Sequence, residues 1–94
     1  MALLGRFTKQ PSETIDYPVD FTDWFAGRTG DSIDTYTMTA DTGISIATHR
    51  RDGFVITAVM TGGTNGTSYK VTVQITTVAG LIKETEFSIK VKEV

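Results

Sequence analysis

Apolar and polar residues alternate along several stretches of this chain, most clearly over residues 69–77. Every second residue of this stretch is large and apolar, in the order Tyr69, Val71, Val73 and Ile75. Alternation with period two, rich in β-branched residues, is typical of a strand with one buried face. The glycine-rich segment before it, residues 62–68, predicts a tight connection that needs positive φ angles.

Alternation predicts further strands over residues 13–21, 33–40, 44–48, 54–61 and 84–92, of which the last is the cleanest half-solvated strand in the chain. Pro18 cannot donate to a β-ladder, so the first of these is expected to be an edge strand or one that crosses between sheets. Both rows of 54–61 are largely apolar, and we predict that the row beginning at Phe54 is the buried one. Between the first two segments, Trp24 is expected to sit in one helical turn or a compact loop that plugs one end of the fold.

Turn signals recur about every 8–12 residues, and no long helix is predicted. Asp52-Gly53 is a strong hairpin signal and places a tip at residues 49–53, while residues 78–81 form a second tip. Tyr69, which opens a strand directly after a turn, suggests the tyrosine corner of immunoglobulin-like sandwiches. We therefore predict an all-β fold, an antiparallel immunoglobulin-like β-sandwich of six to seven strands that spans residues 13–94.

Residues 1–12 are predicted to form an extended N-terminal arm, because their apolar residues lack a period and Pro11 ends regular structure. One interpretation is a frayed terminus. The other is an arm that lays its leucines and Phe7 on a neighbouring subunit, since burying such a side chain is worth roughly 1.5–3 kcal/mol.

Composition and charge limit the classes of partner that the chain is expected to bind. The 94 residues suffice for one domain, and the net charge of −2 is spread without a basic stripe, so no nucleic acid partner is expected. The chain has no cysteine, which excludes disulfides and thiolate metal sites. The apolar run at the N-terminus is too short for a signal peptide or a membrane span, so no membrane partner is expected either.

No group of residues predicts catalysis, a cofactor or a metal. The single histidine, His49, lies on a predicted tip without a marked carboxylate to orient it. Asp16, Asp20 and Asp23 are close in sequence, but their spacing matches no calcium loop. Residues 62–68 lack the lysine and the following helix that a phosphate-binding loop requires.

Five motifs follow one another along the chain: KQP at 9–11, DYPVDFTDW at 16–24, GGTNGTSY at 62–69, TTVAG at 76–80 and FSIKV at 87–91. Together they resemble small structural proteins of tailed bacteriophages that have an immunoglobulin-like fold. The resemblance implies a non-catalytic virion protein, synthesised in the host cytoplasm, that acts as a capsid decoration or as a head-neck or tail accessory subunit. It would bind other virion proteins and be homo-oligomeric or multi-copy in the particle.

A second hypothesis is a carbohydrate- or host-surface-binding module of a tail or baseplate, which would use the aromatic residues Tyr17, Trp24 and Tyr36. The chain also departs from the family pattern, since an apolar pair follows the Ala79-Gly80 turn and the arm is unusually apolar. Such exposed apolar surface suggests burial against a partner. The predicted partner-binding residues are Leu3, Leu4, Phe7, Arg50, Arg51, Val78, Leu81 and Ile82.

Overall fold

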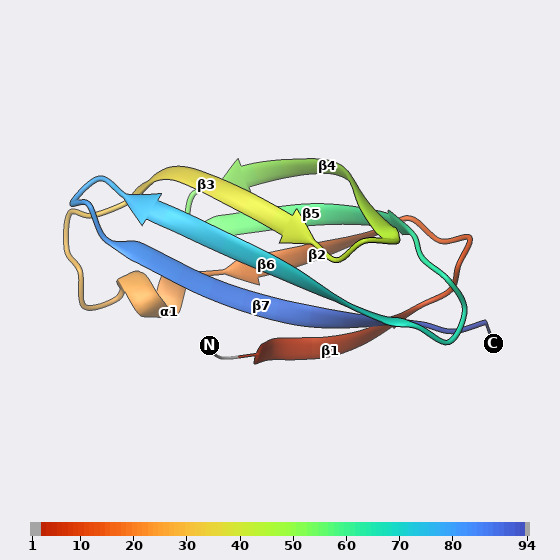
Figure 1. Cartoon of the computed structure of the whole chain (residues 1–94). Helices are drawn as coiled ribbons and strands as arrows, with labels where there is room; N and C mark the ends of the chain where they lie inside the picture. The colour runs from red at the N-terminus through yellow and green to blue at the C-terminus, as the bar shows by residue number, and fades with distance from the viewer. Residues whose placement is uncertain (1–2, 94) are drawn as a thin grey trace.

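The computed structural model describes residues 3–93, with side chains from residue 5 onward. These residues form seven strands and one short helix: β1 (Leu3–Lys9), β2 (Ile15–Asp20), α1 (Thr22–Phe25), β3 (Ile33–Ala40), β4 (Ile44–Asp52), β5 (Val55–Gly62), β6 (Ser68–Thr77) and β7 (Ile82–Val91). One sheet has the order β1-β7-β6-β3 and the other the order β2-β5-β4. The two sheets pack as a sandwich (Figure 1), so the predicted all-β fold is confirmed.

The apolar rows selected by alternation form the core between the sheets. On β5, the row that begins at Phe54 is the buried one, as predicted, because Ile56, Ala58 and Met60 are fully shielded while Val55 and Val59 are half-buried. β6 and β7 contribute the facing rows, which are Tyr69, Val71, Val73, Ile75, Phe87, Ile89 and Val91. Pro18 lies on β2, an edge strand of its sheet, where its missing N–H costs no ladder bond.

Tyr69 anchors the glycine-rich connection, as the sequence predicts. Its hydroxyl accepts a hydrogen bond from the Thr64 backbone N–H at 2.9 Å. Gly63 has φ of 99°, and a Cβ there would lie 2.5 Å from a Val91 methyl and 3.3 Å from the tyrosine ring. The segment is therefore a structural turn, in which glycine supplies both the left-handed backbone and the space for the ring.

The described part of the predicted arm is extended, but it does not project from the sandwich. β1 pairs in parallel with β7, from Leu3 opposite Glu86 to Lys9 opposite Val91. The other four strand pairs of the described residues are antiparallel. The segment completes this sheet because the edge of β7 offers backbone donors and acceptors that a free arm would leave unpaired.

Lys9, at the end of β1, is fully buried. Its ammonium donates to the carbonyl oxygens of Gly62 at 2.7 Å and Gln10 at 2.8 Å, with the Pro11 oxygen at 3.5 Å. A buried ammonium is tolerated only when such acceptors replace water. Because Gly62 ends β5, the lysine ties β1 to the opposite sheet.

The predicted helical turn is present as α1, but the tryptophan is not its main plug. Phe25 is buried and stacks on Phe54 with ring centroids 4.4 Å apart. Trp24 is half-buried and meets the Phe25 ring edge-on at 4.8 Å. Phe25 takes the core position because it points from α1 towards the β4–β5 turn, where the Phe54 carbonyl also accepts the Phe21 N–H at 2.9 Å.

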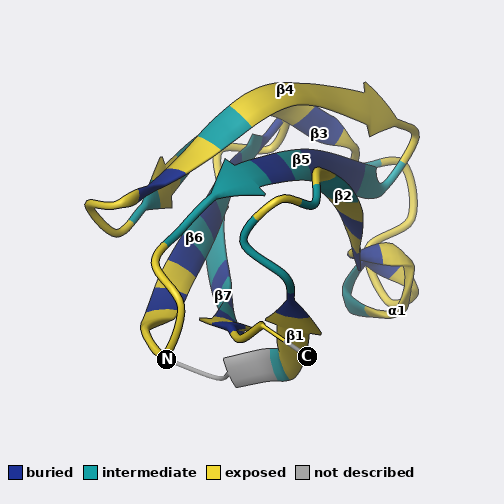
Figure 2. Ribbon diagram, turned by 90° about the vertical axis from the view of Figure 1, so that its right-hand side faces the viewer, coloured by how far each residue is buried: buried dark blue, intermediate teal, exposed yellow. Residues whose placement is uncertain are grey.

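β4 is longer than the pattern predicts. His49 and the two residues after it lie within this strand, so the predicted tip at residues 49–53 is wrong in extent. The chain reverses at Gly53 and Phe54, which confirms the predicted Asp52-Gly53 hairpin. The strand continues because its pairing with β5 runs on to Asp52 opposite Val55. Figure 2 shows β4 exposed along most of its length, in contrast to the buried faces of the inner strands.

Candidate interaction surface

Among the side chains of residues 5–93, four large apolar ones are exposed, and three of them lie in the turn between β6 and β7 or at the first residue of β7. Val78 is 66% exposed, Ile82 65% and Leu81 41%. We call these three residues the apolar tip. Their exposure agrees with the sequence prediction that this turn carries apolar surface to the outside. A cluster of this kind marks an interaction site more often than a single exposed leucine does.

The turn that carries the apolar tip is closed by its own hydrogen bonds. The Thr77 N–H donates to the Leu81 carbonyl at 2.8 Å, and the Gly80 N–H donates to the Thr77 carbonyl at 2.9 Å. The Leu81 N–H donates to the Thr77 hydroxyl oxygen at 3.1 Å. Gly80 has φ of 91°, a conformation that favours glycine. The turn therefore has a defined shape that directs its apolar side chains outward.

Asp31, in the connection between α1 and β3, is outside this turn in sequence and holds it by hydrogen bonds; we call this contact the clamp. Its Oδ1 accepts the Ala79 N–H at 3.1 Å and the Ser32 N–H at 2.9 Å, and the Ser32 carbonyl accepts the Val78 N–H at 3.0 Å. Burial raises the pKa of Asp31, but hydrogen bonds, the Ala79 N–H first among them, outweigh this and hold the pKa below its ordinary value of 3.8. The carboxylate is thus kept charged while it fixes the turn.

The structure brings Arg51 to the same end of the sandwich. Its guanidinium donates to the carbonyl of Ile33, next to the residue that holds Val78. Arg50 points away from that contact and forms an ion pair with Asp52, its Nε 3.4 Å from the carboxylate. Because both partners are mostly exposed, this pair adds little to stability. Figure 1 shows the β6–β7 turn, the start of β3 and α1 gathered at this end.

Phe7, the fourth exposed apolar residue, lies apart from the apolar tip. It pairs with Ile89 on the β1 side of the sheet, and its ring centroid is 5.2 Å from Tyr17 and 5.9 Å from Phe87. With 40% of its surface exposed, Phe7 is mainly a cover for the β1–β2 side of the core. The side chains of Leu3 and Leu4, also predicted to bind a partner, lie outside the described residues.

The aromatic residues of the carbohydrate hypothesis are engaged within the protein. Tyr17 is buried, and Trp24 carries the Arg28 guanidinium 4.4 Å above its ring. The Tyr36 hydroxyl lies 2.7 Å from Nδ1 of His49. Each of the three rings therefore has at least one contact within the protein, and Tyr17 has no exposed face to offer a sugar.

The acidic residues considered for calcium do not gather. Residues 3–93 contain no set of three or more histidine, aspartate or glutamate side chains placed to hold a metal ion. Asp20 instead accepts the Thr22 N–H at 2.9 Å and the Thr22 hydroxyl at 2.5 Å, which orders the entry to α1. In the same part of the chain, no helix has the length and apolar character required to cross a membrane.

Asp31 is the residue of this surface that the sequence pattern misses. The only local signal is its place between Gly30 and Ser32, where aspartate is common in turns. Its role depends on Ala79, 48 positions further along the chain, and alternation cannot reveal such a contact.

Comparison with curated proteins finds no match. Comparison with family models gives a match over residues 9–90 to the model described as podophage GP4 fiber-tail adaptor protein gp77. The matched range includes the whole of β2 to β6, β7 except its last residue, and only Lys9 of β1. It also includes Asp31 and the whole apolar tip. Since the match covers most of the 94 residues, the chain belongs to the family of the podophage GP4 fiber-tail adaptor protein gp77.

Proposed function

We propose that this chain joins a fibre protein to the tail of a bacteriophage and that the apolar tip is one of its contacts. Membership of the family makes the chain a structural protein of a tailed phage and a component of its virion. The role as a fibre-to-tail link is carried over from the described member of the family. Within the earlier set of hypotheses, this favours a tail accessory subunit over a capsid decoration.

The observation that supports a contact through the apolar tip is the combination of exposure and fixed shape. Val78 and Ile82 are each about two-thirds exposed, yet the turn is held by Asp31 and by its own hydrogen bonds. A contact made by a preformed turn loses little conformational entropy on binding. Each large apolar side chain that becomes fully buried contributes roughly 1.5–3 kcal/mol, so three of them can anchor an interface.

The mechanism is adhesive and needs no reaction at the chain itself. In a particle with several copies, weak contacts of a few side chains add up, because the second contact of a linked assembly is effectively intramolecular. We extend the proposal to a multi-copy arrangement and to the immunoglobulin-like class of sandwich, which the Tyr69 corner supports.

The test replaces Ile82 by glutamate in the phage and counts this chain and the fibres in purified virions. Ile82 is exposed, so the isolated Ile82→Glu protein is expected to keep the stability of the wild type. Thr39→Glu, exposed on the outer face of β3, is the matched control. Ile82→Glu virions are expected to lack the fibres, while Thr39→Glu virions keep them. A full complement of this chain and of fibres in the Ile82→Glu virions would refute the proposal.

A further inference from the structure

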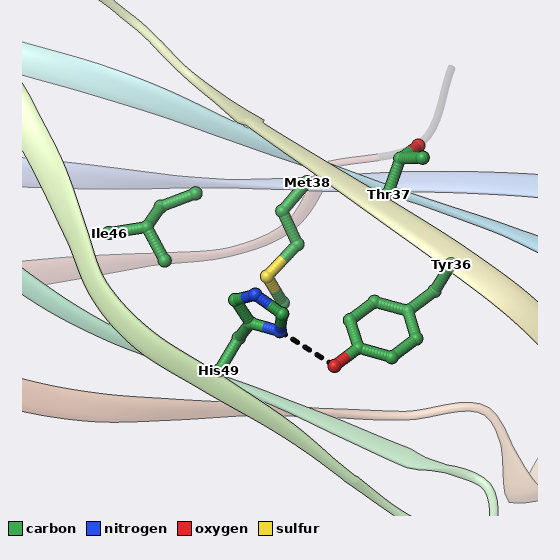
Figure 3. A pocket seen from close by; sticks show the side chains of 5 residues that line it. All are labelled: Tyr36, Thr37, Met38, Ile46 and His49. Atoms are coloured by element: carbon green, nitrogen blue, oxygen red, sulfur yellow. Dashed lines mark hydrogen bonds between the residues drawn. The ribbon is translucent and has the colours of Figure 1, made fainter.

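The two long sides of the sandwich are closed to different degrees. On the β1–β2 side, the rings of Phe7, Tyr17 and Phe87 meet across the gap between the sheets. On the β3–β4 side, a hollow of about 430 Å³ remains between the two edge strands. It is lined by Tyr36, Thr37, Met38, Ile46 and His49. Figure 3 shows Tyr36 and Met38 from β3 pointing towards Ile46 and His49 from β4, with Thr37 turned away.

An irregularity in β4 explains why this side stays open. The register with β5 shifts between Ile46 and Thr48, which is the signature of a bulge. After the shift, His49 lies opposite Ala58 and Arg51 opposite Ile56, so these polar side chains take the core-facing positions. Because they cannot pack into an apolar core, every residue of β4 from position 47 to 52 remains exposed.

Within residues 3–93, neither wall of the hollow has a further strand paired to its outer edge. β3 is the last strand of its sheet, and β4 is the last strand of the other. The outward N–H and C=O groups of such strands can pair with another extended backbone. Met38 and Ile46, which face the hollow, are apolar and half-buried, so they offer places for alternate side chains of an added strand.

The charge of β4 indicates the kind of strand that fits. The chain has a net charge of −2, yet β4 carries two arginines against one carboxylate, Asp52, which Arg50 already pairs. The other wall adds one carboxylate, Asp34. Arg51 donates one N–H to the Ile33 carbonyl, and a guanidinium has five N–H donors, so further donors remain for a ligand. His49 has one ring nitrogen left over from its contact with Tyr36. This end of the hollow therefore offers donors suited to a carboxylate.

We propose that the β3–β4 hollow binds an extended acidic segment of a neighbouring virion protein, which pairs with the edge of β4. An apolar side chain of the segment lies over Met38 and Ile46, and a carboxylate meets Arg51 and His49. The source of the segment, a tail or fibre protein, rests on the proposed function; the site itself rests on the free edges, the hollow and the charge of β4. None of the residues assigned to the hollow belongs to the apolar tip, so one chain can make both contacts.

The test uses synthetic peptides as long as β4, with threonine alternating with valine or phenylalanine, each made with and without a terminal pair of glutamates. Binding to the isotope-labelled full chain is followed by NMR. The acidic peptides are expected to shift the amides of β3 and β4 and to slow hydrogen exchange along β4. Removal of the glutamates is expected to weaken binding by about tenfold or more, since hydrogen bonds to charged groups are worth about 1.5–3 kcal/mol.

Two pairs of variants separate the hollow from the rest of the surface. Met38→Trp fills the hollow and is expected to abolish the shifts, whereas Thr39→Trp, on the opposite face of β3, leaves them. Arg51→Gln keeps a donor for the Ile33 carbonyl but loses the charge, so it is expected to remove the preference for acidic peptides. Arg6→Gln, an exposed position on β1, is its control.

Three results would overturn the proposal. The first is no shift at β3 and β4 with any peptide, and the second is shifts there only with an oligosaccharide. The third is the same shifts on concentrating the chain alone, which would indicate that a second copy binds. The peptide test involves no virion and does not use the apolar tip. The Ile82→Glu protein is expected to bind the acidic peptides as the wild type does. Failure of the peptide test thus leaves the tail role standing, and failure of the virion test leaves the hollow as a strand-binding site.

Discussion

Asp31 and Ala79 lie 48 positions apart in sequence, and a hydrogen bond of 3.1 Å joins the carboxylate of one to the backbone N–H of the other. This bond fastens the β6–β7 turn to the connection before β3. We predict that Asp31→Ala leaves the sandwich folded but loosens the turn. Amide exchange of Val78 and Ala79 should become at least tenfold faster, while the amides of Val71 and Val73 keep their protection. Asp34→Ala, at an exposed position on β3, is the control. Equal protection of the turn in both variants would contradict the clamp.

The charge of Asp31 makes the turn sensitive to acid. Because its pKa is held below the ordinary value of 3.8, the charged form is the one that the folded turn favours. The stabilisation is therefore complete above the unfolded pKa and is lost as the pH falls through the lower folded pKa. Exchange of the Ala79 amide, corrected for its intrinsic pH dependence, should rise below about pH 4. Asp31→Asn should remove this dependence, and its persistence in that variant would point to another group.

Lys9 is expected to be the most costly lysine to replace. Lys9→Met keeps most of the stem volume but leaves the Gly62 and Gln10 carbonyls without their donor. We predict a loss of about 1–3 kcal/mol in the free energy of unfolding, measured by urea denaturation. Lys70→Met, at an exposed position on β6, should change stability by less than about 0.5 kcal/mol. Similar values for the two variants would show that the buried ammonium contributes nothing beyond its stem.

Gly63→Ala tests the tyrosine corner. The substitution forces a left-handed backbone on alanine, and its Cβ would lie 2.5 Å from a Val91 methyl. Left-handed strain of about 1–2 kcal/mol and overpacking of about 1–3 kcal/mol predict a total loss of roughly 2–5 kcal/mol. Thermal unfolding of the variant and of a control, Gly27→Ala, measures this loss. The control should be nearly neutral, because a Cβ at Gly27 would meet nothing within 4 Å. A neutral Gly63→Ala would mean that the turn can move away from Tyr69.

The faces of the strands could be predicted from sequence because alternation depends only on local geometry. The buried rows of β5, β6 and β7 follow from it, and the exposure of Val78 follows from its place in a predicted turn. The parallel pairing of β1 could not be predicted, since its pattern says nothing about which edge it meets. The burial of Lys9 depends on the Gly62 carbonyl, which the fold alone brings near.

The candidate interaction surface also has parts that the sequence predicts and parts that it does not. The apolar tip is visible in sequence as Leu81 and Ile82 directly after a glycine turn. The clamp by Asp31 and the hollow between β3 and β4 are not, because each joins distant segments. The bulge near Ala47 also hides His49 and Arg51, since a single inserted residue reverses which side chains face the core.

The position of this chain in a reconstruction of the whole virion is the direct test of the proposed link between fibre and tail. We predict density for the sandwich at the junction of a fibre and the tail, with Val78 and Ile82 buried against a neighbouring protein. Location on the capsid surface, or a position at the tail with the apolar tip facing solvent, would contradict it.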